Sequence, residues 1–157
     1  DPAEILDLCR AKGLTVATAE SCTGGMVGAA LTDIAGSSDV YERGVITYSK
    51  GAKMTLLRVQ VETLEAHGAV SEEVAREMAE GLLFAAPVDI SVSVTGIAGP
   101  GGSENKPEGR VCFGLATRAG TQTETVAFGA IGRAAVRKAA TAHARDLIGA
   151  AAARAAG

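Results

Sequence analysis

Hydrophobic residues recur along this chain in two patterns, one with the period of an amphipathic helix and one in short runs typical of strands. The helical pattern predicts helices over residues 3–12, 26–35, 52–58, 61–66, 72–86 and from about 132 to 149. Runs rich in Val, Ile and Thr predict strands over residues 14–19, 43–49, 88–95, 110–117 and 121–128. This order of elements predicts an α/β protein, a three-layer α/β/α sandwich around a mixed, mostly parallel sheet.

Some segments allow more than one interpretation. Residues 88–95 alternate between apolar and small polar side chains, which fits a half-buried strand or a central strand whose hydroxyls face a helix. Residues 96–109 contain five glycines and two prolines and so predict a loop, ordered or disordered. The Ala-rich end after Gly149 is expected to fray.

A length of 157 residues suits one hydrophobic core, so a single domain over residues 1–157 is predicted.

Composition and charge narrow the classes of function. The net charge is −3 and the isoelectric point about 5.4, which disfavours nucleic acid, because phosphate-backbone affinity needs clustered Lys and Arg. Two Tyr and three Phe are too few for base-stacking platforms. Three cysteines at scattered spacing fit reduced thiols, and no apolar run reaches the roughly 18 residues that span a bilayer. We therefore expect a cytoplasmic protein that contacts neither membrane nor nucleic acid.

Ser21 is the first candidate for chemistry. It lies in Thr-Ala-Glu-Ser-Cys-Thr-Gly-Gly (residues 18–25), between a predicted strand and a predicted helix. Amides at a helix N-terminus can stabilise an oxyanion or bind a phosphate, and the two glycines would let a ligand approach the backbone. The alternative is that Ser21 or Thr23 only caps the helix.

A serine hydroxyl attacks only when a base takes its proton, and we predict Lys53 as that base. The two histidines do not suggest a triad, because His67 falls at a helix end and His143 at the solvent boundary of the last helix. A desolvated lysine has a lowered pKa and can accept a proton, and Lys53 precedes an apolar pair along its predicted helix. Lys50 is expected to be more exposed. A solvated surface lysine is the alternative for Lys53.

Other chemistries find less support in the chain. No spacing of His, Cys or carboxylates matches a metal-ligand motif, so no metal site is predicted. Cys22 could attack a substrate if the helix N-terminus lowered its pKa, but a buried structural thiol is the favoured interpretation.

A glycine-rich loop follows the predicted strand 88–95. Residues 95–103, Thr-Gly-Ile-Ala-Gly-Pro-Gly-Gly-Ser, have nearly the spacing of a phosphate loop, but Gly102 replaces its lysine, so ATP hydrolysis is not expected. The glycines indicate close approach of the backbone to a ligand, with a plain surface turn as the alternative.

Taken together, four motifs resemble one family, the CinA C-terminal domain family. They are residues 18–25, Tyr48-Ser49 with Lys53, His-Gly-Ala-Val-Ser at residues 67–71, and residues 95–100 followed by Lys106-Pro107. The resemblance covers nearly the whole chain in order.

The resemblance implies an α/β/α enzyme that hydrolyses the carboxamide of nicotinamide mononucleotide to nicotinate mononucleotide and ammonia, without metal or organic cofactor. It implies Ser21 as nucleophile, Lys53 as general base, and the amides of residues 23–25 as an oxyanion hole. The glycine loop and Arg133 would bind the phosphate of this nucleotide substrate. The substrate-binding residues expected on this basis are Thr23, Gly24, Gly25, Tyr48, Thr95, Gly96, Ala98, Gly99, Gly101, Gly102 and Arg133. Members of the family commonly form homo-oligomers, which we also expect here.

Two positions depart from the family pattern. Gly132 stands where the family usually has an acidic residue before the arginine, and residues 101–106 are one residue shorter than expected. Many members are fused behind a larger nucleotide-processing domain, so the chain would be a stand-alone form or a fragment. The alternatives are a non-catalytic binding module linked to competence or DNA damage, and an amidase that acts on another amide.

Overall fold

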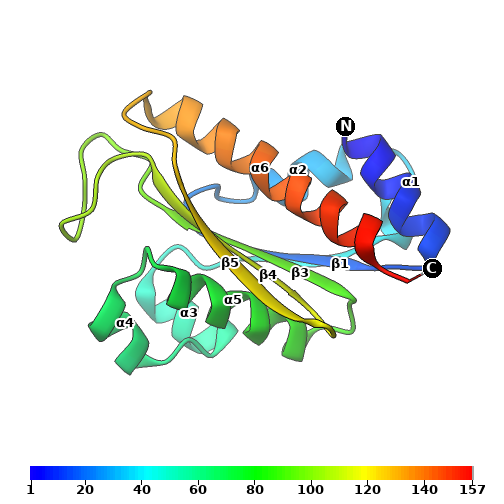
Figure 1. Ribbon diagram of the computed structural model, residues 1–157, viewed down its shortest axis with the longest axis horizontal. Helices are drawn as coiled ribbons and strands as arrows, with labels where there is room; N and C mark the ends of the chain where they lie inside the picture. Colours follow the sequence, from blue (N-terminus) through cyan, green and yellow to red (C-terminus); the bar gives the residue numbers. More distant parts are fainter. Residues whose placement is uncertain (157) are drawn as a thin grey trace.

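A five-stranded sheet forms the centre of the computed structural model, which describes residues 1–156 (Figure 1). Its strands are β1 (Val16–Glu20), β2 (Tyr41–Ile46), β3 (Ile90–Gly96), β4 (Arg110–Thr117) and β5 (Gly120–Ala127), in the spatial order β2-β1-β3-β4-β5. β1 pairs in parallel with β2 and β3, whereas β4 runs antiparallel to β3 and β5. The sheet is therefore mixed, as predicted, with β4 as the strand of opposite direction.

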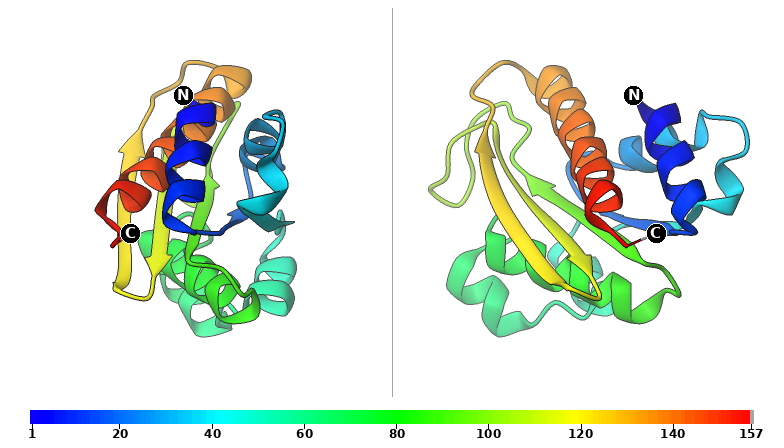
Figure 2. Two further views of the ribbon diagram at one scale, coloured as in Figure 1. Left: turned by 90° about the vertical axis from the view of Figure 1, so that its right-hand side faces the viewer. Right: turned by 45° about the vertical axis from the view of Figure 1, so that its right-hand side comes forward.

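Helices cover both faces of the sheet. One layer contains α1 (Pro2–Lys12), α2 (Met26–Thr32) and α6 (Arg133–Arg154), and the other contains α3 (Lys50–Leu57), α4 (Val61–His67) and α5 (Glu72–Ala85). A 3-10 turn, η1 (Ser37–Asp39), precedes β2. Figure 2 shows the two helical layers from two further sides. The predicted three-layer α/β/α sandwich is confirmed.

Alternation along the central strands divides the core in two. Val92 and Val94 of β3 pack in the cluster that contains α1, α2 and α6 residues. On the other face, Ser93 Oγ donates to the carbonyl oxygen of Ala75 in α5 (2.6 Å), and Thr95 Oγ1 donates to that of Ala69 (2.8 Å). Residues 88–95 thus contain a central strand whose hydroxyls face a helix, the second of the two interpretations.

The predicted fraying after Gly149 is wrong. Helix α6 continues to Arg154, and Ala151 and Ala152 are buried. Lys12, at the end of α1, donates from Nζ to three carbonyl oxygens at the end of α6, at 2.8–3.1 Å. Lys12, more than a hundred positions earlier in the sequence, therefore supplies hydrogen-bond donors to carbonyl oxygens that the end of an isolated helix would leave unpaired.

The parallel strands place several loops at one edge of the sheet. The carboxyl ends of β1, β2 and β3 lie at this edge, where open α/β sheets bind ligands. Ser21 follows β1, Tyr48 follows β2 and residues 96–109 follow β3, while α6 begins at the same edge (Figure 1, left).

Candidate active site

Ser21 lies in the turn that joins β1 to α2. Its backbone N–H donates to the carbonyl oxygen of Val94 in β3 (2.9 Å), which fixes the turn to the sheet. The residue is buried, and its Oγ lies 2.9 Å from Nζ of Lys53. The fold therefore brings together the two side chains expected to be nucleophile and base.

The buried carboxylate of Glu20 organises this turn. Glu20 is only 2% exposed, and its carboxylate accepts four hydrogen bonds. Oε1 accepts from Thr23 Oγ1 (2.6 Å) and from the backbone N–H groups of Gly25 (3.1 Å) and Val27 (3.0 Å). Oε2 accepts from the N–H of Gly28 (3.0 Å). The unpaired amides at the start of α2 are thus bound by a side chain of the protein itself.

Two of the amides expected to form an oxyanion hole are already occupied. The N–H of Gly24 donates to the carbonyl oxygen of Ser21 (3.0 Å), and that of Gly25 donates to the buried carboxylate. The amides of Cys22 and Thr23 have no hydrogen-bond acceptor among residues 1–156. Because Thr23 is fully buried, the candidate oxyanion donor becomes the amide of Cys22, directly after the nucleophile.

Lys53 reaches the serine from α3, which Ser49 caps. The lysine is 1% exposed, although it carries the longest side chain of the buried set. Besides contacting Ser21, Nζ donates to the carbonyl oxygen of Thr47 (2.7 Å) and, at 3.4 Å, to that of Tyr48. All these partners are neutral oxygens, so no carboxylate in contact compensates for the burial of the ammonium.

This burial sets the protonation of Lys53. Removal of the ammonium from water lowers the pKa of Lys53 from 10.5 to about 8. At pH 7 roughly a tenth of the molecules then carry the neutral amine, compared with less than about one in a thousand for a lysine in water. The solvated surface lysine that the sequence left open is excluded.

Cys22 lines the same site but does not have the properties of a nucleophile. Burial raises the pKa of its thiol to about 11, so the thiolate is scarce at neutral pH. Its carbonyl oxygen accepts a hydrogen bond from Nε of Arg137 in α6 (3.0 Å), and the guanidinium also reaches the carbonyl of Thr23 (3.4 Å). The burial and the raised pKa of the thiol support a structural role, the favoured interpretation of Cys22.

A cavity of about 430 Å³ opens over Ser21 and Lys53. It contains all the expected site residues except Thr23, Gly24 and Gly25, which lie outside its lining. The lining residues are Ser21, Cys22, Tyr48, Lys50, Lys53, Ala69, Val70, Thr95, Gly96, Ile97, Ala98, Gly99, Pro100, Gly101, Gly102, Ser103, Glu104 and Arg133. Residues far apart in the sequence therefore form one pocket at the carboxyl edge of the sheet.

The glycine loop, residues 96–109, is ordered and leads into β4 instead of a helix. It therefore lacks the strand–loop–helix arrangement of a nucleotide triphosphate loop, in agreement with the missing lysine. Arg133, at the start of α6, donates to the carbonyl oxygen of Gly99 (2.6 Å) and to the hydroxyl of Tyr48 (3.1 Å). This places a guanidinium at the mouth of the cavity beside an exposed aromatic ring.

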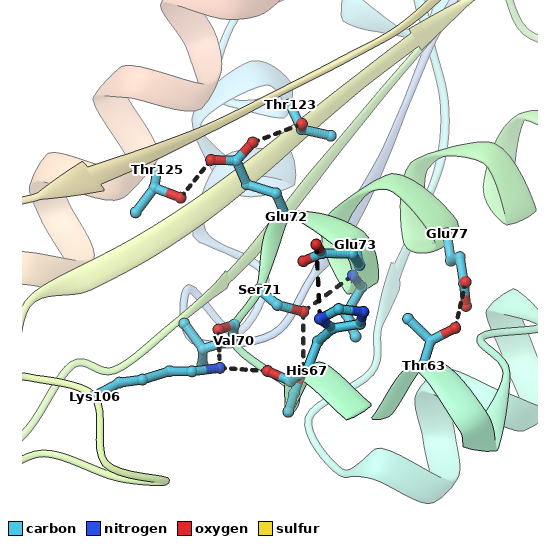
Figure 3. Close-up of polar contacts among 12 residues, drawn as sticks. Thr63, His67, Val70, Ser71, Glu72, Glu73, Glu77, Lys106, Thr123 and Thr125 are labelled. Atoms are coloured by element: carbon cyan, nitrogen blue, oxygen red, sulfur yellow. Dashed lines mark hydrogen bonds and ion pairs between the residues drawn. The ribbon is translucent and has the colours of Figure 1, made fainter. Parts of the chain in front are cut away.

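Lys106 fixes the far part of this loop. Ser103 and Lys106 pair through their backbones, and the two residues between them adopt positive φ angles. The Lys106 ammonium donates to the carbonyl oxygens of His67 (2.6 Å) and Val70 (2.5 Å), as Figure 3 shows. We call residues 103–106 the 103–106 turn. Through Lys106, this turn fixes the loop after β3 to the segment between α4 and α5.

Neither histidine lies in the cavity. His67 ends α4, with Nδ1 3.7 Å from a carboxylate oxygen of Glu73, and His143 packs against the ring of Phe113 with centroids 4.5 Å apart. Within residues 1–156, no group of three or more His, Cys, Asp or Glu side chains could hold a metal ion. The helices among these residues are too short or too polar to span a bilayer.

Residues 2–151 match a known family, the CinA C-terminal domain. The chain belongs to this family. Nicotinamide-nucleotide amidohydrolase PncC of Escherichia coli K12 is 54% identical over 136 residues, which cover 86% of this chain and 82% of that protein. A CinA-like protein of Chlorobaculum tepidum is 56% identical over 115 residues, which cover 73% of this chain. The match spans only 27% of that longer relative.

Solved structures of CinA proteins have the same fold. The competence/damage inducible protein CihA from Agrobacterium tumefaciens superposes with a TM-score of 0.93 at 42% identity, covering 98% of this chain and 93% of that one. The CinA superfamily protein KP700603 from Klebsiella pneumoniae 700603 gives a TM-score of 0.94 at 37% identity, covering 98% and 96%. The resemblance identified from the motifs is therefore confirmed at the level of family and fold.

Sequence reasoning did not find all the residues that shape the site of this CinA domain. It missed the role of Glu20, the contact of Arg137 with the serine turn, and an ion pair between Lys50 and Glu104. A sequence signal existed only for Glu20, since a carboxylate just before a helix start is typical of a residue that binds free amides. The other two contacts depend on tertiary packing.

Proposed function

We propose that this chain hydrolyses the carboxamide of nicotinamide mononucleotide to nicotinate mononucleotide and ammonia, a step of pyridine-nucleotide recycling. The observation that carries the proposal is the contact between the buried Lys53 amine and the hydroxyl of Ser21, 2.9 Å apart inside a cavity. The name of the relative PncC, a nicotinamide-nucleotide amidohydrolase, supports the choice of substrate.

The chemistry follows from the protonation of Lys53. The neutral amine accepts the proton of the Ser21 hydroxyl while Oγ forms a bond to the carboxamide carbon. The carbonyl oxygen becomes an oxyanion, which the free amide of Cys22, a residue of the cavity lining, would stabilise. Lys53 then gives its proton to the amide nitrogen, which leaves as ammonia. Water, activated by the neutral amine, hydrolyses the acyl ester of Ser21 and restores both groups.

The phosphate of the substrate would bind at the mouth of the cavity. Arg133 supplies a guanidinium there, and the backbone of Gly99 and Gly101 has the positive φ angles that bring a peptide close to a ligand. In the absence of substrate, Arg133 donates to a carbonyl oxygen and a phenol, which it can exchange for phosphate oxygens. This arrangement supports a requirement for the nucleotide over free nicotinamide.

A non-catalytic binding module is the competing function. Such a module needs a cavity, but it gains nothing from a buried lysine whose ammonium lacks a carboxylate partner. An amidase for another amide uses the same two residues, so only the choice of substrate separates it from the proposal.

Ammonia release tests the proposal. Purified protein would be given nicotinamide mononucleotide, with nicotinamide, nicotinamide riboside and glutamine as alternative amides. We expect turnover of the mononucleotide, and a loss of about 10³-fold or more in Ser21→Ala. Ser38→Ala, on the exposed turn η1, makes the same chemical change away from the cavity and should be fully active. Full turnover by Ser21→Ala would exclude Ser21 as nucleophile, and silence on all four amides would favour a binding module.

A further inference from the structure

Basic side chains outnumber carboxylates in the described lining of the cavity. Lys50, Lys53 and Arg133 bring cationic groups to the lining, and among the described lining residues Glu104 is the one carboxylate. The three cations fit the phosphate and the oxyanion of the proposed reaction. They do not explain a carboxylate in a site for a phosphorylated substrate, so Glu104 calls for a separate account.

Glu104 is fixed in place before any ligand arrives. One carboxylate oxygen accepts a hydrogen bond from the N–H of Ala69 (3.2 Å), and the other lies 3.0 Å from the ammonium of Lys50. Its backbone belongs to the 103–106 turn, which Lys106 fixes to the segment before α5. Its side chain remains 29% exposed, so a carboxylate that two contacts hold in place forms part of the cavity wall.

The same carboxylate shares a cavity with the reacting centre. Glu104 lines this cavity together with Ser21 and Lys53, and it pairs with Lys50, which lies one turn before Lys53 in α3. Lys53 contacts Ser21, and Ser21 must contact the carboxamide carbon. In nicotinamide mononucleotide that carbon is bonded directly to the pyridinium ring, whereas the ribose and the phosphate are further away. With the carboxamide at Ser21, the ring, which carries a positive charge, therefore lies inside the cavity that Glu104 lines.

We propose that Glu104 is a specificity-determining residue that binds the positively charged pyridinium ring of the substrate and so distinguishes it from uncharged carboxamides. The inference rests on the proposed function and deepens it by naming the ring charge as a feature that the site recognises. The ring is cationic before the reaction and stays cationic through it, so the attraction acts on binding and appears mainly in KM.

The test uses two ligands that differ only in ring charge. Nicotinamide mononucleotide is compared with benzamide riboside 5′-monophosphate, which keeps the carboxamide, ribose and phosphate but has a neutral phenyl ring. Binding is measured by calorimetry at pH 7 on Ser21→Ala and on Ser21→Ala with Glu104→Gln. We expect Glu104→Gln to weaken binding of the mononucleotide about tenfold and that of the neutral ligand less than about twofold. Lys50, without its partner, would repel the cationic ring in addition.

Glu108→Gln is the matched control. Glu108 lies in the same loop, accepts a hydrogen bond from the N–H of Gly101 (2.6 Å) and is outside the cavity lining. It should leave the ratio of the two affinities unchanged. Equal weakening of both ligands by Glu104→Gln would overturn the inference, because it would indicate a change in loop shape. If the unaltered protein does not turn over nicotinamide mononucleotide at all, the proposed function fails and the inference with it.

Discussion

Two hollows of similar volume in this molecule differ in chemistry. The active-site cavity has a volume of about 430 Å³, and a second hollow between α4, α5 and β5 has about 460 Å³. We call the second one the acidic groove. Its lining residues are Glu62, Thr63, Ala66, His67, Glu72, Glu73, Arg76, Glu77 and Thr123. Several of them appear in Figure 3.

Carboxylates of the acidic groove have partners from neighbouring elements. Glu72 accepts from the hydroxyls of Thr123 (2.8 Å) and Thr125 (2.7 Å) in β5. Glu77 accepts from the hydroxyl of Thr63 (2.6 Å) and the N–H of Gln60 (2.8 Å). These bonds connect α5 to β5 and to α4, and the hydroxyls from Thr125 and Thr123 lower the pKa of Glu72. The two hydroxyls therefore favour the charged form that Glu72 already has in water at neutral pH.

The active-site cavity shows the opposite arrangement. Lys53 is buried against neutral oxygens, and its pKa moves toward neutrality, away from the state it has in water. Burial of the Lys53 ammonium therefore costs the fold free energy, whereas the charge of Glu72 is stabilised by its hydrogen bonds. The two hollows have similar volumes and cannot be distinguished by size. The buried Lys53 ammonium, which has no carboxylate partner, marks the active-site cavity as the one suited to chemistry.

Replacement of Lys53 should give the largest difference between the two hollows. Lys53→Met keeps a long apolar stem but removes the base, so we expect kcat/KM to fall by about 10³-fold or more. The free energy of unfolding should rise by about 1–2 kcal/mol, because the desolvated ammonium is lost and only its hydrogen bonds offset the gain. Ammonia release and urea unfolding measure the two quantities. A destabilised variant would mean that Lys53 is a structural residue.

The pH dependence should give an effect of intermediate size. Because the neutral form of Lys53 is the competent one, kcat/KM should rise about tenfold per pH unit up to about pH 8 and then level off. The pKa is lower in the folded protein than in the unfolded chain, where it is near 10.5. Between these two values the unfolded chain binds more protons, so the free energy of unfolding should increase with pH.

Lys53→Met is the control for the pH dependence of stability. The part of the stability that rises from about pH 8 to pH 10.5 should be absent in the variant, since no lysine titrates at that position. A flat activity profile between pH 6 and pH 8 in the unaltered protein would show that Lys53 is not the base.

The sequence predicted the fold and part of the site for different reasons. Helices and strands follow from local periodicity, so most were found to within a few residues. Ser21 and Lys53 stood out because a strand-to-helix turn and a lysine before an apolar pair are local features, although their contact spans 32 positions in the sequence. The family resemblance implied that the two residues act together, and the structure shows their contact.

The errors in the sequence interpretation concern contacts around the site. The amides of Gly24 and Gly25 looked free for a substrate, but the first bonds to the carbonyl oxygen of Ser21 and the second to Glu20, whose place before the helix was the one available signal. Lys50 was correctly expected to be exposed, at 57% of its side chain, but its partner Glu104 lies in a loop 54 residues later. Such pairs become visible only when the sheet places the loops after β2 and β3 at one edge.

Glu72→Gln should have the smallest effect, and it tests the other side of the comparison. Glutamine keeps one acceptor for the hydroxyls of Thr123 and Thr125, so we expect a loss of less than about 1 kcal/mol in the free energy of unfolding. Because the pKa of Glu72 is lowered by folding, this loss should be present at pH 7 and vanish as the pH falls through the folded pKa. Ammonia release should stay within about twofold, since the groove shares no lining residue with the cavity. A tenfold fall in turnover with unchanged stability would mean that the acidic groove takes part in the reaction, and that uncompensated burial is not what marks a functional hollow in this fold.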